Sequence, residues 1–181
     1  MEISEWKERV EAERKEKDEF FKMPFQSPLP FNECQKFKGL SYYFPDWSYR
    51  FELELQEHKE KETLKIEDTQ GNEREFLRWG EVNFRTSDTD CKLQAYKSSP
   101  EENRLFVPFR DATSGKETYG AGRYLDLETG KDQTSQGKWV FDFNDAYNPW
   151  CAYSKDYACP FTPPENWLKV SVYAGEKDYK K

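Results

Sequence analysis

The sequence predicts a mainly β fold, either an antiparallel β-barrel or a compact β-sandwich, with an N-terminal α-helix and long C-terminal loops. Three observations predict it. From about residue 37, apolar side chains recur at every second position, which is typical of half-buried strands. The breaks between these stretches are short and polar, as they are between antiparallel neighbours. Aromatic side chains, 17% of the 181 residues, replace scarce aliphatic ones as core material.

The composition favours one folded domain over a disordered chain. Leu, Val, Ile and Phe make up 33 of the 181 residues, just below the level of about 20% that accompanies disorder at high net charge. The net charge is only -7, however, and 31 residues are aromatic, whereas disordered chains are poor in aromatic residues. The acidic balance also argues against nucleic-acid binding, which needs a basic surface.

The chain shows no feature of a membrane or exported protein. It has no run of 18 apolar residues, so no transmembrane helix and no membrane partner are expected. Residues 1–22 lack the apolar core of a signal peptide. A cytoplasmic location is the default expectation, although a leader removed from the natural gene is left open. We expect three segments: a helix at 1–22, a proline-rich connector at 23–36 and a single all-β domain at 37–181.

The first element is a helix over residues 2–22. The hydroxyl of Ser4 can cap the N-terminus of this helix. The stretch 13–19 carries charged residues alone, so this turn is expected to face solvent, supported by Glu–Lys pairs four residues apart. Apolar residues at helical spacing indicate where the helix packs on the sheet: Ile3, Trp6, Val10, Phe20 and Phe21.

The connector that follows contains Pro24, Pro28 and Pro30. Proline lacks the backbone N–H that helices and central strands need, so Met23–Pro30 is predicted to be extended. After it, Tyr49–Gln56 alternates apolar and polar side chains as a half-buried strand does. Similar stretches predict the remaining strands: residues 64–66, 76–84, 93–96, 105–107, 139–143 and 168–174.

The C-terminal part of the chain carries the residues with chemical potential. Four segments combine Gly, Asn, Pro, charged and aromatic residues, namely 110–115, 118–124, 142–153 and 159–166. The connection from 143 to 167 is long for a compact domain and has no helical period. Loops of that kind are packed or functional in their own right. The sequence therefore points to residues 110–166 as the region in which to seek a site.

Two strings in this region carry a resemblance to a known family. They are RLFVPFRDATSGKETYGAGRYLDLE and VFDFNDAYNPWCAYSKDYACPFTPPENWLKVSVYAGEK, which together run from Arg104 to Lys177. The chain resembles the uncharacterised bacterial and archaeal proteins grouped as domain of unknown function 1684. The helix, Ser27–Leu29 and the FKGLSYYF stretch extend the resemblance over nearly the whole chain. Because that family is named for its lack of a known activity, the resemblance implies little about function.

An enzyme is one hypothesis for these motifs. Asp111, Asp142 and Glu165 are the candidate catalytic carboxylates, and a hydrolase would use Asp142 or Asp111 with Arg123 as the holder of an anion. The competing interpretation is a structural ion pair of Arg123 with Asp142 or Asp111 that fixes the loop, and ion pairs of that kind are commoner than catalytic dyads. The alternation in WVFDF places Asp142 opposite the aromatic side chains, either in solvent or under the long loop.

Cysteine and metal chemistry receive little support from the sequence. Four cysteines are too few for a disulfide scaffold in a chain of this length, and a Cys151–Cys159 bridge is expected only in an exported protein. The one histidine, His58, lies in a charged turn and is expected to face solvent. A zinc site needs three or four Cys or His ligands at short spacings. No metal and no cofactor are expected, and the oligomeric state is left open.

Small-molecule binding fits the composition best. A nearly closed sheet holds side chains or one small ligand, and ligand pockets combine aromatic walls with a few polar groups. A third hypothesis is a structural protein whose motifs fix the long loops. The candidate ligand-binding residues share the C-terminal motif segments: Arg110, Tyr119, Arg123, Tyr124, Asn144, Tyr147, Asn148, Cys151 and Asn166.

Overall fold

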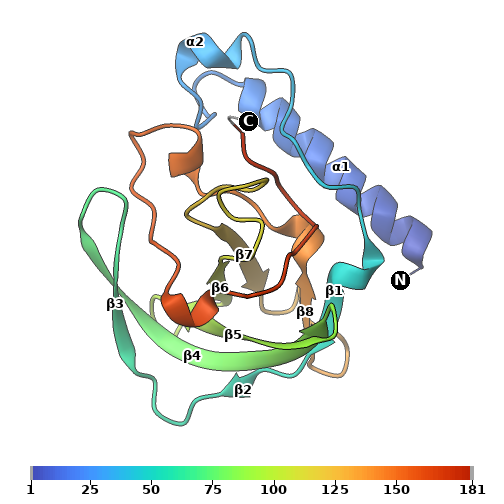
Figure 1. Ribbon diagram of the computed structural model, residues 1–181, viewed down its shortest axis with the longest axis vertical. Coiled ribbons are helices and arrows are strands. Elements are labelled where there is room, and N and C mark those ends of the chain that lie inside the picture. The colour runs from blue at the N-terminus through green and yellow to red at the C-terminus, as the bar shows by residue number, and fades with distance from the viewer. Residues whose placement is uncertain (1, 180–181) are drawn as a thin grey trace.

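The computed structural model describes residues 2–179 and shows a mainly antiparallel β protein with an N-terminal helix (Figure 1). Helix α1 (Ile3–Lys22) lies along one side of the molecule, and the long curved strands β4 (Glu73–Thr86) and β5 (Thr89–Lys97) lie on the opposite side. The predicted fold class is therefore confirmed. Within the described residues the strands form two sheets in a sandwich-like arrangement and do not close into a barrel.

The larger sheet has six strands and is antiparallel throughout. Its order is β2 (Gln56–Glu57), β4, β5, β6 (Arg104–Phe109) and β7 (Arg123–Glu128), with β3 (Thr63–Glu67) pairing β4 beside β2. The smaller sheet pairs β1 (Arg50–Leu53) with β8 (Trp139–Asp142). The short polar breaks from β3 to β6 join antiparallel neighbours, as expected, whereas the break between β2 and β3 joins two strands that both pair with β4.

Two local features show how the sequence bends the large sheet. Ser87 and Asp88 both have positive φ, which gives the tight turn that reverses the chain between β4 and β5. Gly80 lies at the irregularity between β4 and β5. A Cβ atom there would come within 2.8 Å of the carbonyl oxygen of Gln56, so only glycine lets β2 approach β4 this closely.

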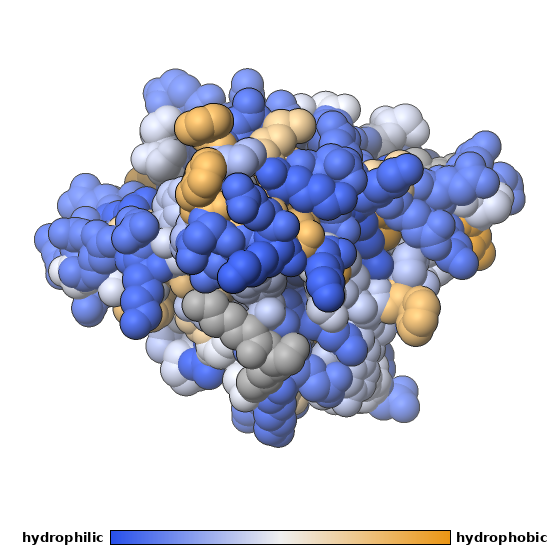
Figure 2. All heavy atoms as spheres, turned by 90° about the horizontal axis from the view of Figure 1, so that it is seen from above, coloured by the Kyte–Doolittle hydropathy of each residue, from blue (hydrophilic) through white to orange (hydrophobic). Residues whose placement is uncertain are grey.

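The sheet buries apolar side chains on both faces. One face carries the main core, to which β4–β8 and the C-terminal segment contribute residues such as Val82, Leu93, Leu125 and Phe143. The other face carries a smaller cluster of rings centred on Tyr96, Phe106 and Tyr124. The aromatic residues therefore supply core volume, as the composition predicts. Figure 2 shows an outer face that is largely hydrophilic, with hydrophobic side chains in small separate groups.

Helix α1 differs from the prediction in three places. It begins at Ile3 after Glu2, so Ser4 is not its cap. Ile3 is 57% exposed, whereas Trp6, Val10 and Phe21 are buried. The central turn does not simply face solvent, because two of its basic side chains reach the body of the protein: Arg14 and Lys17.

Three further segments differ from the prediction. The connector is not extended: residues 23–27 form a turn, and a short helix α2 follows at Phe31–Cys34. Strand β7 lies in a segment for which the sequence predicted no strand. Residues 168–174 alternate as expected, with Leu168, Val170, Val172 and Ala174 buried, but they form no strand. Leu168 and Val170 bond to the backbone of Arg110 and Ala112, whereas Val172 and Ala174 bond to side chains.

Candidate functional site

Arg123 and Asp111 are the buried side chains that bond to the backbone of the C-terminal segment, where no neighbouring strand does so. The guanidinium of Arg123, 1% exposed, donates hydrogen bonds to the carbonyl oxygens of Val172 (3.0 Å), Ala174 and Glu176 (3.2 Å). A carboxylate oxygen of Asp111 lies 3.5 Å from it, and the other accepts the N–H of Val172 at 2.6 Å. The predicted structural ion pair between Arg123 and Asp111 is present, and it holds the C-terminal segment against the core.

Two asparagines also use their side chains to bond buried backbone groups in other parts of the fold. The amide of Asn166 accepts the N–H of Gln94 (2.8 Å) and donates to the carbonyl of the same residue (2.9 Å). Asn144 bonds in the same two-sided way to the backbone of Asp46, at 2.9 Å in each direction. A primary amide carries both a donor and an acceptor, so it can replace a backbone partner. Both asparagines are buried and serve this role.

A third buried network surrounds Glu176, which is 0% exposed. Its carboxylate accepts hydrogen bonds from the hydroxyl of Tyr153, the backbone N–H of Asn148 (2.7 Å) and the ammonium of Lys17 (3.2 Å). The side chain of Asn148 donates to the carbonyl of Lys177 at 2.8 Å. These contacts join helix α1, the long loop and the C-terminal segment.

The remaining predicted residues lie at the edges of these networks. Arg110 stacks over the ring of Trp167, with 4.5 Å from its guanidinium carbon to the ring centre. Glu165 accepts from the hydroxyl of Tyr96 at 2.5 Å and pairs with Arg78 at 2.8 Å. The hydroxyl of Tyr119 lies 3.6 Å from the sulfur of Cys151. The predicted residues therefore do not converge on one point.

Some of them reach a cavity between α1, β7, β8 and the short 3₁₀ turn η2 (Phe143–Asp145), which we call the helix-side cavity. Its volume is about 390 Å³. Asp142 lies at its wall and is 4% exposed. Its carboxylate accepts from the indole N–H of Trp6 (2.6 Å), from Arg9 (2.9 Å) and from the side chain of Asn144 (2.8 Å).

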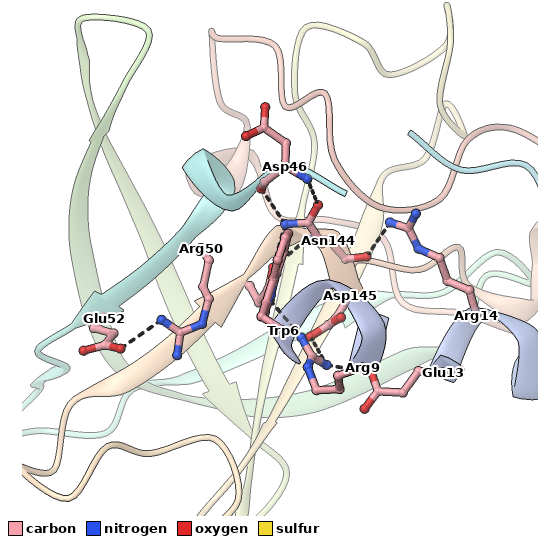
Figure 3. Close-up of polar contacts among 10 residues, drawn as sticks. Trp6, Arg9, Glu13, Arg14, Asp46, Arg50, Glu52, Asn144 and Asp145 are labelled. Carbon is pink, nitrogen blue, oxygen red and sulfur yellow. Dashed lines mark hydrogen bonds and ion pairs between the residues drawn. The ribbon is translucent and has the colours of Figure 1, made fainter. Parts of the chain in front are cut away.

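Figure 3 shows how α1 brings Trp6 and Arg9 to this point, beside Asn144 and Asp145. Arg9 also lies 3.1 Å from Asp145 and 2.6 Å from Glu13. Burial and the neighbouring charge of Asp142 raise the pKa of Asp145 to about 7, and Arg9 opposes the rise. Asp142 and Asp145 thus share Arg9 as an ion-pair partner, and Asp145 is the more exposed of the two.

A second hollow, the ring-lined cavity, lies over the outer face of β4, β6 and β7 and measures about 460 Å³. Phe76 and Phe106 stack with ring centres 5.4 Å apart, and Tyr124 meets Phe106 edge-on at 4.8 Å. Arg74 and Arg104 stand at its rim, each about half exposed. Aromatic walls with a few charged groups are typical of ligand pockets.

The two cavities share the residues Asp126 and Tyr147. The hydroxyl of Tyr147 donates to one carboxylate oxygen of Asp126, and Arg104 lies 3.6 Å from the same oxygen. The other oxygen of Asp126 is buried and has no partner. Burial raises the pKa of Asp126, and the hydrogen bond from Tyr147 opposes the rise. An unpartnered buried acceptor is costly, which marks this pair as the candidate site.

Sequence reasoning found Tyr124 and Tyr147 and missed the rest of this site: Arg74, Phe76, Arg104, Phe106 and Asp126. A signal was available in RYLDLE. There Leu125 and Leu127 pack in the main core, so Tyr124 and Asp126 share the opposite face. The register also places Asp126 beside Phe106. Recognising β7 as a strand would have revealed this face.

Searches for other kinds of site add two observations. Among residues 2–179, no group of three or more His, Cys, Asp or Glu side chains is arranged to hold a metal ion. No helix in the same range combines the length and the apolar character needed to cross a membrane.

Comparisons with known proteins complete the description. The family model described as protein of unknown function (DUF1684) matches residues 35–177. The chain is also similar to an uncharacterized protein of Haloarcula marismortui whose structure was determined in solution by NMR. The two are 38% identical with a TM-score of 0.73, over 96% of this chain and 95% of that one. No curated protein matches the chain.

Proposed function

We propose that this chain, which belongs to the DUF1684 family, binds a small organic molecule at the ring-lined cavity. The family description assigns no activity, so the proposal stands on geometry alone. The observation that carries it is the buried oxygen of Asp126, which has no partner within the protein and lies between two cavities. A ligand N–H or O–H that reaches this oxygen would remove the cost of an unmade hydrogen bond.

The surroundings of Asp126 indicate the chemistry of the ligand. The rings of Phe76, Phe106, Tyr124 and Tyr147 offer apolar faces and edges to a planar or apolar group. Arg74 and Arg104 at the rim favour a negatively charged group pointing outward. The expected ligand therefore has a ring, a hydrogen-bond donor and an acidic substituent.

The hydrolase hypothesis finds less to support it. The carboxylate oxygens of Asp142 are occupied by Trp6, Arg9 and Asn144. Those of Asp111 are occupied by Thr113, Ser114 and Val172. Arg123 donates to backbone carbonyls and lines neither cavity. We therefore place ligand binding before catalysis.

A melting-shift screen of metabolites tests the proposal. A ligand present at 100 times its dissociation constant stabilises the folded state by about 2.7 kcal/mol, which raises the melting temperature by several degrees. We expect the compounds that do so to share a ring and a donor group. Titration calorimetry on wild type, Asp126→Asn and Asp90→Asn then locates the site. Asp90 is 84% exposed and far from the cavity along β5, so it is the matched control.

An ionised oxygen accepts a hydrogen bond about twice as strongly as a neutral amide oxygen. The difference is about 1 kcal/mol, so Asp126→Asn should weaken binding about fivefold. Asp90→Asn should bind as wild type does. The proposal fails if the screen yields no compound, or if a compound that it yields binds Asp126→Asn with unchanged affinity.

A further inference from the structure

Two cysteines of the long loop lie against each other outside the proposed ligand site. Cys151 belongs to the short turn η3 (Trp150–Ala152), and Cys159 lies in the extended stretch before Pro160. The backbone N–H of Cys151 donates to the sulfur of Cys159 at 3.3 Å. Because the nitrogen and the Cβ atom of a residue are two bonds apart, the Cys159 sulfur lies within reach of the Cys151 side chain.

The stretch that carries Cys159 is fixed to the turn between β3 and β4. Thr69 exchanges two hydrogen bonds with Cys159, one through its backbone N–H at 3.0 Å and one through its hydroxyl at 3.2 Å. Arg74, from β4, donates to the carbonyl of Ala158 at 2.8 Å, which holds a positive charge next to Cys159. The position of this sulfur therefore depends on three segments that the fold brings together.

The two thiols have unlike acidities. The pKa of Cys159 falls to about 7, because its sulfur accepts hydrogen bonds from the Cys151 thiol and from backbone N–H groups and because Arg74 favours the thiolate; burial opposes the fall. The pKa of Cys151 rises, since its thiol donates to that sulfur and is itself buried. At neutral pH, Cys159 is the nucleophile of the pair and Cys151 stays protonated.

Cys159 is reachable by small reagents although it is only 8% exposed. It lines a third hollow of about 270 Å³, together with Trp150, Tyr157 and Pro160. A peroxide molecule is far smaller than this hollow. By contrast, Cys91 has a pKa that burial and Asp90 raise, and the thiol of Cys34, 4% exposed, points to a backbone carbonyl.

We propose that Cys159 is a site of oxidation by hydroperoxides and that Cys151 converts the oxidised form to a disulfide. The thiolate of Cys159 attacks one peroxide oxygen. An S–O bond forms, the O–O bond breaks, and hydroxide or alkoxide leaves, so sulfur loses two electrons and the peroxide gains them. Cys151 then attacks the resulting sulfenic acid. An S–S bond forms, the S–O bond breaks, and the departing hydroxide takes the Cys151 proton as water.

The disulfide would join η3 to the stretch that is anchored on Thr69. The stretch that carries Cys159 borders the ring-lined cavity through Pro160, and the third hollow shares Pro160 and Tyr147 with that cavity. The inference does not depend on the proposed ligand function, because it concerns different atoms and is tested without a ligand.

Peptide mapping of the full chain tests the proposal. The reduced protein is treated with hydrogen peroxide at pH 7, its remaining thiols are alkylated, and it is cut with trypsin. Lys155 lies between the two cysteines, so a Cys151–Cys159 disulfide appears as peptides 139–155 and 156–169 joined together. We expect this joined species to form while Cys34 and Cys91 remain alkylated. Equal oxidation of all four thiols, or no joined species, would overturn the proposal.

Three variants separate the two steps. In Cys151→Ser, a dimedone-reactive sulfenic acid should accumulate at Cys159, because no second thiol removes it. In Cys159→Ser, neither dimedone labelling nor a joined species should appear at Cys151. Cys91→Ser is the control and should form the joined species as wild type does. Dimedone labelling of Cys151 in Cys159→Ser would show that the roles of the two thiols are assigned wrongly.

The wild-type protein provides a readout that does not depend on variants. An ordinary cysteine with a pKa of about 8.5 is roughly 3% thiolate at pH 7, against about half for Cys159. Because a less basic thiolate is also a weaker nucleophile, we expect iodoacetamide to alkylate Cys159 only several-fold faster than an ordinary thiol. Its rate should rise with pH to half of its maximum near pH 7. A midpoint above pH 8.5 would contradict the assignment of Cys159 as the thiolate.

Discussion

Arg123 and Asp111 supply to residues 172–176 the hydrogen bonds that a neighbouring strand normally supplies. One guanidinium reaches three carbonyl oxygens and one carboxylate reaches a backbone N–H. Asn144 and Asn166 do the same for Asp46 and Gln94. Buried backbone N–H and C=O groups need hydrogen-bond partners. Where no neighbouring strand supplies them, these polar side chains do. Most motif residues are thus explained by structure.

Replacing Arg123 tests this explanation. Arg123→Met keeps the volume but leaves Asp111 and three carbonyl groups without their partner in the core. Breaking a buried ion pair from one side costs about 3–5 kcal/mol, and we expect a loss of that size in urea unfolding. Arg85→Met is the control, because Arg85 is 61% exposed and should change stability by about 0.5 kcal/mol or less. A loss equally small for Arg123→Met would refute the structural role.

Residue types predicted an ion pair of Arg123 with Asp142 or Asp111, and in the structure the partner is Asp111. They did not predict that the pair would hold residues 172–176, since the contact spans about fifty positions and depends on the tertiary fold. Asp126 was overlooked for a related reason. Its role follows from the face of β7 on which it lies, and β7 was not among the predicted strands.

Helix α1 is the element that fastens the long loop and the C-terminal segment together. It does so with polar contacts at three successive turns: Arg9 with Asp142, Arg14 with the carbonyls of Tyr43 and Asn144, and Lys17 with Glu176. Its apolar residues Trp6, Val10 and Phe21 are buried beside them. Both the polar contacts of its basic side chains and its buried apolar residues therefore hold the helix against the rest of the protein.

Lys17→Met tests the contribution of this charge. Glu176 would keep Tyr153 and Asn148 as hydrogen-bond donors and lose its ion pair with Lys17. Because Lys17 is 29% exposed, we expect a loss of about 2 kcal/mol, below the full cost of a broken buried pair. Lys15→Met, at an exposed position of the same helix, is the matched control. Equal melting temperatures for the two variants would show that the charge is not needed for docking.

At the scale of elements, the sequence predicted strands well wherever alternation and a neighbouring strand coincided, as in β3 to β6. The prediction failed where a segment alternates but has no neighbouring strand. Residues 168–174 alternate, but they bond partly to the backbone of Arg110 and Ala112 and partly to side chains, so the pattern described their burial and not their hydrogen bonding. For α1, the apolar stripe was correct at Trp6, Val10 and Phe21. The charged turn looked solvent-facing because the partner of Lys17 lies 159 residues away.

On the scale of the whole molecule, two sheets, the long helix α1 and a C-terminal segment without strand structure are arranged around one main core. The alternating pattern, the short turns and the aromatic content were enough to predict this fold class. The way in which the sheets close was not predictable, since a barrel and a sandwich share the same alternation. The cavities were also beyond prediction, because their walls come from β4, β6, β7 and the long loop together.

The pH dependence of stability follows from the junction between α1 and the core. Asp145 has an ordinary pKa of 3.8 and a folded-state pKa of about 7. Between these values the folded state binds more protons than the unfolded state, so this group's contribution to stability is present at low pH and is lost as the pH rises through 7. Asp145 is 37% exposed, so solvent screening limits the effect to about 1 kcal/mol.

Asp145→Asn removes this titration. We expect the stability of the variant relative to wild type to increase between pH 5 and pH 8, as measured by thermal unfolding at a series of pH values. Asp90→Asn, whose carboxylate is exposed, should show a constant difference over the same range. A constant difference for Asp145→Asn as well would mean that Asp145 titrates like an ordinary carboxylate.

The backbone carbonyls that receive Arg123 have a consequence for protein synthesis. They are translated about fifty positions after Arg123, and the ribosome hides the most recent stretch of every nascent chain. While the C-terminal segment is still in the exit tunnel, β7 carries a cation whose backbone acceptors have not emerged, and Val172 and Ala174 are missing from the core. Until residues 172–176 have emerged from the ribosome, the native core therefore cannot form.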